Sequence, residues 1–107
     1  MAGNGKVQVQ MIGFATVKLT SPEGKVLLVD PWLTGNDFFP AGNPAVPEVY
    51  KKDVGAFGNV DIILQTHAHF DHLNINDLLA ISKRFDPIIL TPVETAIYIR
   101  EKTDIDN

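Results

Sequence analysis

The chain has 107 residues, of which 45% are hydrophobic and 21% are charged. This length leaves room for one small domain, and the composition is that of a globular protein and excludes a disordered chain. Thirteen acidic residues against nine basic ones give a net charge of −4. This charge argues against nucleic acid as a partner, because phosphate binding needs clustered Lys and Arg. The absence of cysteine excludes disulfides and thiolate metal sites.

No targeting or membrane segment is recognisable in the sequence. Residues 1–10 contain no apolar stretch of signal-peptide length. No window approaches the roughly 18 apolar residues that a membrane span needs. We therefore expect a cytoplasmic protein that makes no membrane contact.

Three strands and a long loop are predicted in the first part of the chain. Residues 6–12 and 15–20 alternate apolar and polar side chains, and 25–30 is a short apolar run. Residues 31–59 contain four prolines and four glycines, which predicts an irregular connection with a helical turn near 48–54.

The second part of the chain is predicted to alternate strands and helices. Asn74 is expected to cap the first helix, and Thr91 with Glu94 has the pattern of a capping box at the start of the second. The predicted elements are a strand over 60–66, a helix over about 75–85, a strand over 88–91 and a helix from Pro92 to about Lys102.

These elements predict one domain over 1–107 of the α/β type, an α+β arrangement on a mixed sheet. It consists of a strand meander (1–30), a loop (31–59) and a βαβα unit (60–107), whose crossover requires a parallel strand pair. The helices cover only one face of this sheet. The other face has no predicted cover unless the 31–59 loop folds over it, and an exposed apolar face marks an interface. Its residues include Val7, Val9, Met11, Leu27 and Val29.

The residues that carry chemistry are concentrated directly after the strand over 60–66. His67, His69 and His72 are the only histidines of the chain, and Asp71 lies among them. Imidazole and carboxylate groups are ligands of zinc, manganese and iron. His67 and His69 project to the same side of an extended backbone and can chelate one ion. Asp71 and His72 can then face a second ion, and two ions about 3.5–4 Å apart hold a bridging hydroxide. The alternative is a polar loop that is rich in histidine by chance.

The segment His67-Ala68-His69-Phe70-Asp71-His72 matches the HxHxDH signature of the metallo-β-lactamase superfamily. The strand VDIILQT before it and the earlier segment LLVDPWLTGN are also similar to that family. The chain resembles in particular its bacterial metal-dependent hydrolases related to the ascorbate-6-phosphate lactonase. This resemblance covers nearly the whole chain and implies the N-terminal half of an αββα sandwich.

The resemblance also implies roles for individual residues. His67 and His69 would bind the first metal, and Asp71 and His72 the second, with Asp71 also orienting the attacking water. Two zinc ions are expected in the complete family site, with manganese or iron as alternatives. Asp30 matches an acidic residue that supports the metal loop from behind. Its alternative role is that of an aspartate ending a strand in a turn.

The chain departs from the family pattern in two respects. Phe14 stands where many relatives have a histidine, and a phenylalanine cannot bind metal. Family domains are also about twice as long, and their second half supplies further ligands, whereas residues 73–107 contain no histidine. We therefore expect the chain to be completed by a second copy in a homodimer or by a complementary C-terminal half.

Two functions are compatible with these residues. The first is a metal-dependent hydrolase that uses a metal-bound hydroxide on a small-molecule ester, lactone or phosphodiester-type substrate. The second is a non-catalytic, truncated or split half-domain that needs a partner chain to complete its metal site. Trp32, Phe38 and Phe39 either wall a substrate pocket or pack over the core.

Overall fold

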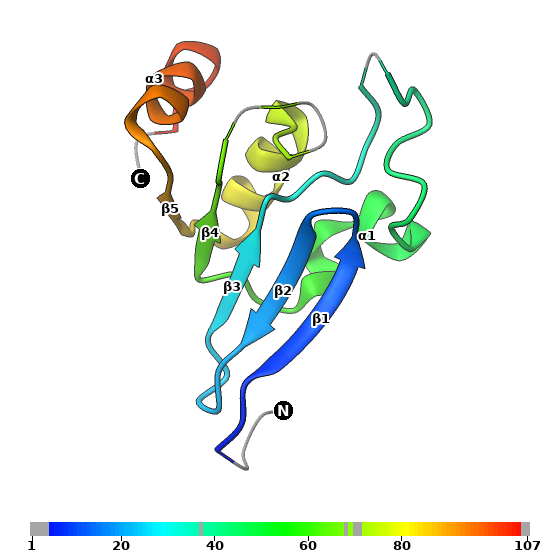
Figure 1. Ribbon diagram of the computed structural model, residues 1–107, viewed down its shortest axis with the longest axis vertical. Helices are drawn as coiled ribbons and strands as arrows, with labels where there is room; N and C mark the ends of the chain where they lie inside the picture. The colour runs from blue at the N-terminus through cyan, green and yellow to red at the C-terminus, as the bar shows by residue number, and fades with distance from the viewer. Residues whose placement is uncertain (1–4, 37, 68, 70–71, 106–107) are drawn as a thin grey trace.

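The computed structural model describes residues 5–36, 38–67, 69 and 72–105 (Figure 1). It contains a five-stranded mixed sheet with helices, which confirms the predicted fold class. In this part of the chain no helix is long and apolar enough to cross a membrane. The strands are β1 (Gln8–Gly13), β2 (Thr16–Thr20), β3 (Val26–Val29), β4 (Ile62–Leu64) and β5 (Ile88–Leu90). The helices are α1 (Glu48–Lys52), the 3-10 helix η1 (Val54–Phe57), α2 (Ile75–Phe85) and α3 (Val93–Lys102).

The strands follow one another across the sheet in chain order, from β1 to β5. β1, β2 and β3 pair antiparallel, whereas β3, β4 and β5 pair parallel. The 31–59 segment with α1 and η1 connects β3 to β4, and α2 connects β4 to β5 (Figure 1). The carboxyl ends of β3 and β4 therefore lie side by side at one end of the sheet, where open α/β sheets place their ligands.

The core lies on one face of the sheet only. Ile12, Leu28 and Ile63 from the strands are buried against Leu78 and Ile81 of α2. The 31–59 segment contributes to this same core, so it does not cover the opposite face. Its buried members are Leu33, Val46 and Phe57.

Asp77 ties the start of α2 to the segment that follows β3. Its side chain is buried and accepts hydrogen bonds from the backbone nitrogens of Leu33 and Thr34, at 2.7 and 2.9 Å. It also accepts one from the Thr34 hydroxyl at 2.7 Å. Asn74 caps α2 as predicted, because its side chain accepts from the Asp77 nitrogen at 3.0 Å.

The capping box predicted at the start of α3 is wrong. Pro92 occupies the N-cap position, and the helix has no side-chain cap. The Thr91 hydroxyl instead donates to the Gln65 carbonyl oxygen at 2.7 Å. Thr91 directly follows β5, and Gln65 directly follows the neighbouring strand β4. The pairing of the two strands therefore brings the Gln65 carbonyl oxygen within reach of the Thr91 hydroxyl.

The second face of the sheet is apolar and uncovered by the described residues, and we call it the apolar face. The strand register aligns its side chains in two rows that each cross all five strands. At the outer strands Val9, Met11 and Ile88 expose 63%, 68% and 59% of their surface. One row holds Val9, Leu19, Leu27, Ile62 and Ile88, and the other holds Met11, Val17, Val29, Leu64 and Leu90.

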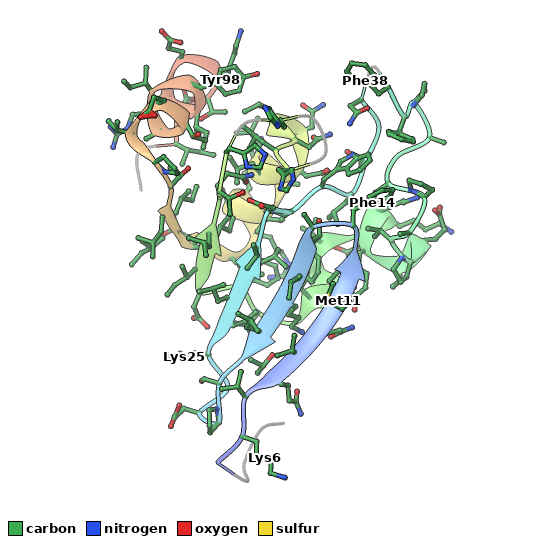
Figure 2. All side chains as sticks on the ribbon, in the orientation of Figure 1. Lys6, Met11, Phe14, Lys25, Phe38 and Tyr98 are labelled. Atoms are coloured by element: carbon green, nitrogen blue, oxygen red, sulfur yellow. The ribbon has the colours of Figure 1, made fainter. Side chains whose placement is uncertain are left out.

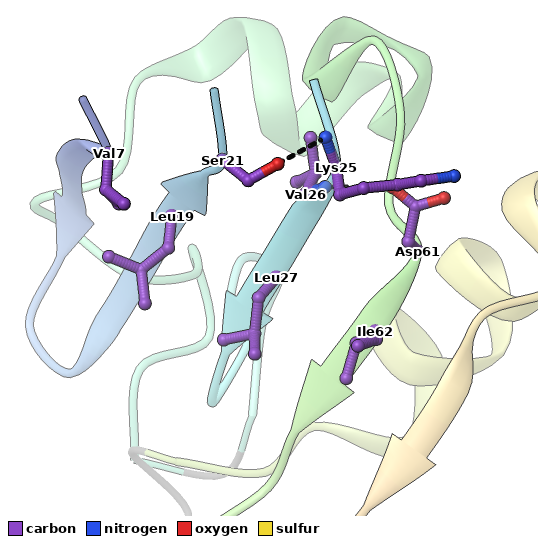
Figure 3. Close-up of a pocket in the computed structure, with 8 residues that line it drawn as sticks. All are labelled: Val7, Leu19, Ser21, Lys25, Val26, Leu27, Asp61 and Ile62. Atoms are coloured by element: carbon purple, nitrogen blue, oxygen red, sulfur yellow. Dashed lines mark hydrogen bonds between the residues drawn. The ribbon is translucent and has the colours of Figure 1, made fainter. Parts of the chain in front are cut away.

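A shallow pocket opens at one end of the apolar face (Figure 3). It lies toward the start of β3 and β4, the end of the sheet where Lys25 is found in Figure 2. Phe14 and Phe38 lie at the other end, which is also the end where β3 and β4 finish (Figure 2). The pocket is therefore remote from the histidines. Its lining residues are Val7, Leu19, Ser21, Lys25, Val26, Leu27, Asp61 and Ile62.

Candidate metal centre

The histidine segment lies between the carboxyl end of β4 and the start of α2. His67, His69 and His72 are described by the structure, whereas Asp71 lies outside the described residues. His67 and His72 are half-buried and His69 is exposed. The backbone turns here, because the nitrogens of His72 and Leu73 both donate to the His69 carbonyl oxygen at 2.9 Å.

The three imidazole rings lie together. The ring centroids of His67 and His69 are 4.5 Å apart, and those of His67 and His72 are 4.0 Å apart. Among the described residues, which do not include Asp71, no group of three or more His, Asp or Glu side chains is arranged to hold a metal ion. The rings are thus adjacent, and metal ligation by His67, His69, Asp71 and His72 stays a prediction.

Asp30 is a buried residue whose carboxylate contacts one of these rings, that of His72. It follows β3 directly, has a left-handed backbone with φ of 44°, and exposes 2% of its surface. Its Oδ1 accepts from Gln65 Nε2 at 3.0 Å and from the Thr66 backbone nitrogen at 2.7 Å. Its Oδ2 accepts from the Thr66 hydroxyl at 2.6 Å and contacts His72 Nδ1 at 2.8 Å. Four partners fill the acceptor capacity of an ionised carboxylate.

These contacts bear on both roles considered for Asp30. The residue follows a strand in a turn, and its carboxylate also contacts a histidine of the motif, whereas its support of a metal site stays a prediction. The left-handed backbone is a conformation in which Asp and Asn are tolerated better than most other residues. In this turn the carboxylate lies against Gln65 and Thr66, the residues that follow β4.

Sequence reasoning missed the two polar residues that complete this arrangement, Gln65 and Thr66. The Gln65 amide is fully buried and, besides Asp30, donates to the carbonyl oxygens of His67 and His72 at 3.1 and 2.6 Å. It joins the two ends of the histidine loop. The Thr66 hydroxyl lies 2.8 Å from His67 Nδ1. The available signal was a pair of polar residues ending an otherwise apolar strand directly before the histidines.

The aromatic residues near this end of the sheet form a packed cluster. Trp32 is fully buried, and its ring lies 5.4 Å from that of Phe14 and 5.3 Å from that of Phe39. For Trp32 this favours core packing over a pocket wall. Phe38 exposes 69% of its surface and Phe14 exposes 52%, so both rings remain accessible at this end of the sheet (Figure 2).

Comparison with known proteins gives a consistent set of relatives. The profile of a family described as "Beta-lactamase superfamily domain" matches residues 8–105. A protein of Solibacter usitatus is 35% identical over 96 residues, which cover 90% of this chain and 36% of the relative. A protein of Cupriavidus metallidurans is 48% identical over 69 residues, and one of Polynucleobacter asymbioticus is 42% identical over 69 residues. Each of these matches covers 64% of this chain, and they cover 21% and 22% of the two relatives, respectively. All three are named "UPF0173 metal-dependent hydrolase". The chain spans about a fifth to about a third of their length.

Proposed function

The chain belongs to the beta-lactamase superfamily, and we propose that it forms the metal-binding part of a metal-dependent hydrolase. The observation that carries this proposal is that three imidazole rings lie next to one another at the carboxyl end of a parallel strand pair, with one of them, His72, on the buried Asp30 carboxylate. The names of the relatives support a hydrolase over a non-catalytic half-domain.

The donor set fits a divalent cation. His67, His69 and His72 provide imidazole nitrogens, and Asp71 adds a carboxylate from the same loop. Asp30 holds the His72 ring through Nδ1, in the way that carboxylates behind metal-binding histidines fix their orientation. A bound zinc, manganese or iron ion lowers the pKa of water to about 7 and so supplies a nucleophile at neutral pH.

The substrates that we propose are small molecules with an ester, lactone or phosphodiester-type bond. In this proposal His67 and His69 serve the first metal, and Asp71 and His72 serve the second. Asp71 also orients the attacking water. Zinc as the metal and a cytoplasmic location stay predictions.

Hydrolysis of generic substrates tests the proposal. The zinc-loaded chain should hydrolyse p-nitrophenyl acetate or bis(p-nitrophenyl) phosphate faster than zinc alone, and His67→Ala/His69→Ala should remove this excess. Asp61→Asn is the control, because Asp61 lies at the opposite end of β4 and should leave turnover unchanged. A chain that binds zinc and shows no excess turnover would contradict catalysis by this part of the fold alone.

We further propose that a complementary C-terminal half of the fold covers the apolar face and completes the metal site. A structural zinc site has four protein ligands and a catalytic one three, and the motif offers only two for each of two ions. A second copy would bring only the same motif again. The relatives contain about two thirds or more of their length outside the match, which supports a complementary half over a homodimer.

Sedimentation equilibrium with dye binding tests this cover. Burial of apolar surface contributes about 25 cal/mol of favourable free energy for each Å² removed from water. Because the rows of the apolar face are exposed, the chain alone should self-associate without a defined stoichiometry and bind an apolar dye. The variant Met11→Lys/Ile88→Lys should weaken both effects, because both side chains lie on the exposed outer strands. If the chain is a well-folded monomer that binds no dye, the proposal that the apolar face needs a covering partner is wrong. A defined two-fold dimer would replace the complementary half by a second copy.

A further inference from the structure

The Thr66 hydroxyl lies between two groups of the candidate metal centre. Its oxygen is 2.6 Å from Asp30 Oδ2 and 2.8 Å from His67 Nδ1. On the other side, the same Asp30 Oδ2 is 2.8 Å from His72 Nδ1. One carboxylate oxygen is thus linked to two imidazoles, to His72 directly and to His67 through a hydroxyl.

Counting protons along this chain of contacts fixes the direction of each hydrogen bond. An ionised carboxylate only accepts, so Thr66 Oγ1 donates its single proton to Asp30 Oδ2. The hydroxyl then has no proton left for His67, so it accepts one from His67 Nδ1. By the same rule, His72 Nδ1 donates to Asp30 Oδ2. Both imidazoles therefore carry their proton on Nδ1, an assignment that follows from the hydrogen-bond network.

The consequence concerns the nitrogen that is left to bind metal. A neutral imidazole protonated on Nδ1 has its lone pair on Nε2. His67 and His72 thus have the same tautomer, and their ring centroids lie 4.0 Å apart. We infer that Thr66 is a positioning residue, whose hydroxyl extends the orienting effect of Asp30 to His67 and so prepares its Nε2 for a metal ion. The inference rests on the proposed function for its metal, whereas the tautomer itself needs none.

Thr66 is suited to a substitution experiment because it is an exposed residue two positions after the end of β4. Thr66→Val keeps the shape of the side chain and removes the hydroxyl. Thr66→Ser restores the hydroxyl with one methyl group fewer. Thr20→Val is a matched control, since Thr20 ends β2 at the opposite end of the sheet from the histidines.

Nitrogen-15 NMR of the imidazoles in the metal-free chain at alkaline pH reads the tautomers directly. In the unmodified chain and in Thr66→Ser, we expect His67 and His72 in the Nδ1–H form. In Thr66→Val, His67 should leave that form while His72, which Asp30 holds directly, should keep it. A His67 that is Nε2–H in the unmodified chain, or that stays Nδ1–H in Thr66→Val, would overturn the inference.

Zinc titration of the same proteins measures the effect on the metal. Loss of a residue that orients a ligand typically costs 10- to 100-fold in metal affinity, so Thr66→Val should bind zinc about 10- to 100-fold more weakly. Thr66→Ser and Thr20→Val should stay close to the unmodified chain. Equal affinities of Thr66→Val and Thr20→Val would contradict the positioning role. A chain with the expected tautomers that binds no zinc would contradict the proposed function and leave the assignment of the imidazole protons in place.

Discussion

Replacing Asp30 by Asn should destabilise the fold more than the same replacement at Asp61. The four partners of Asp30 are divided between its two oxygens, so an Asn side chain keeps its single oxygen for the obligate donors Gln65 Nε2 and Thr66 N. Its NH₂ group then faces the Thr66 hydroxyl and His72 Nδ1, which must reverse their hydrogen bonds, and all four bonds lose the charge of the carboxylate. Asp61 also accepts two hydrogen bonds, from Val26 N at 2.8 Å and Asn59 Nδ2 at 2.7 Å, but both reach Oδ2. An Asn at this position keeps both with its single oxygen.

The size of the difference follows from the hydrogen bonds. A hydrogen bond to a charged group contributes about 1.5–3 kcal/mol to stability, and one between neutral groups contributes about 0.5–1.5 kcal/mol. Replacing the carboxylate by a neutral amide therefore costs roughly 1 kcal/mol for each hydrogen bond that it makes. With four bonds affected, Asp30→Asn should lower the free energy of unfolding by about 4 kcal/mol. Asp61→Asn should cost about 1 kcal/mol, because its partner Asn59 is exposed to water. Asn also tolerates the left-handed backbone at position 30, so strain does not confound the comparison.

Urea unfolding followed by the fluorescence of Trp32 measures both variants. Trp32 is the only tryptophan of the chain and is fully buried, so its emission reports loss of the core. Equal free energies of unfolding for Asp30→Asn and Asp61→Asn would refute the reasoning, because the division of donors between two oxygens would then have no energetic consequence.

Two further predictions use the same unfolding assay. Asp77→Ala leaves the backbone nitrogens of Leu33 and Thr34 without their acceptor and should cost about 4 kcal/mol. Asp77→Asn keeps one acceptor oxygen and should cost clearly less, so equal losses would contradict this role of the side chain. Gly35→Ala places a methyl group against the Pro40 carbonyl oxygen and should cost about 1–3 kcal/mol. An unchanged stability of Gly35→Ala would mean that the two segments are not in close contact.

Much of the fold was predictable because local patterns and tertiary structure agree. The alternation over 6–12 and 15–20 and the helix predicted over 75–85 correspond to β1, β2 and α2. The apolar face was also predictable, since period-two alternation puts Val9 and Met11 on the side away from the helices. These features depend on neighbours in the sequence, which a pattern can report.

Features that depend on residues far apart in the sequence were not predictable in the same way. Thr91 has the signature of a helix cap, but its hydroxyl donates to the carbonyl oxygen of Gln65, which directly follows the adjacent strand β4. Gln65 and Thr66 looked like ordinary ends of a strand until the parallel pairing of β3 and β4 brought Asp30 beside them. The histidines were found from the sequence because the motif is contiguous.

Zinc content tests the central claim, that the histidine loop holds a divalent metal, most directly. The 107-residue chain and the variant His67→Ala/His69→Ala are each incubated with zinc, freed of unbound metal by gel filtration and measured by elemental analysis. Trp32 fluorescence checks that the variant remains folded. We expect zinc to elute with the unmodified chain and to be lost from the folded variant. Equal zinc content in the two proteins would contradict the claim.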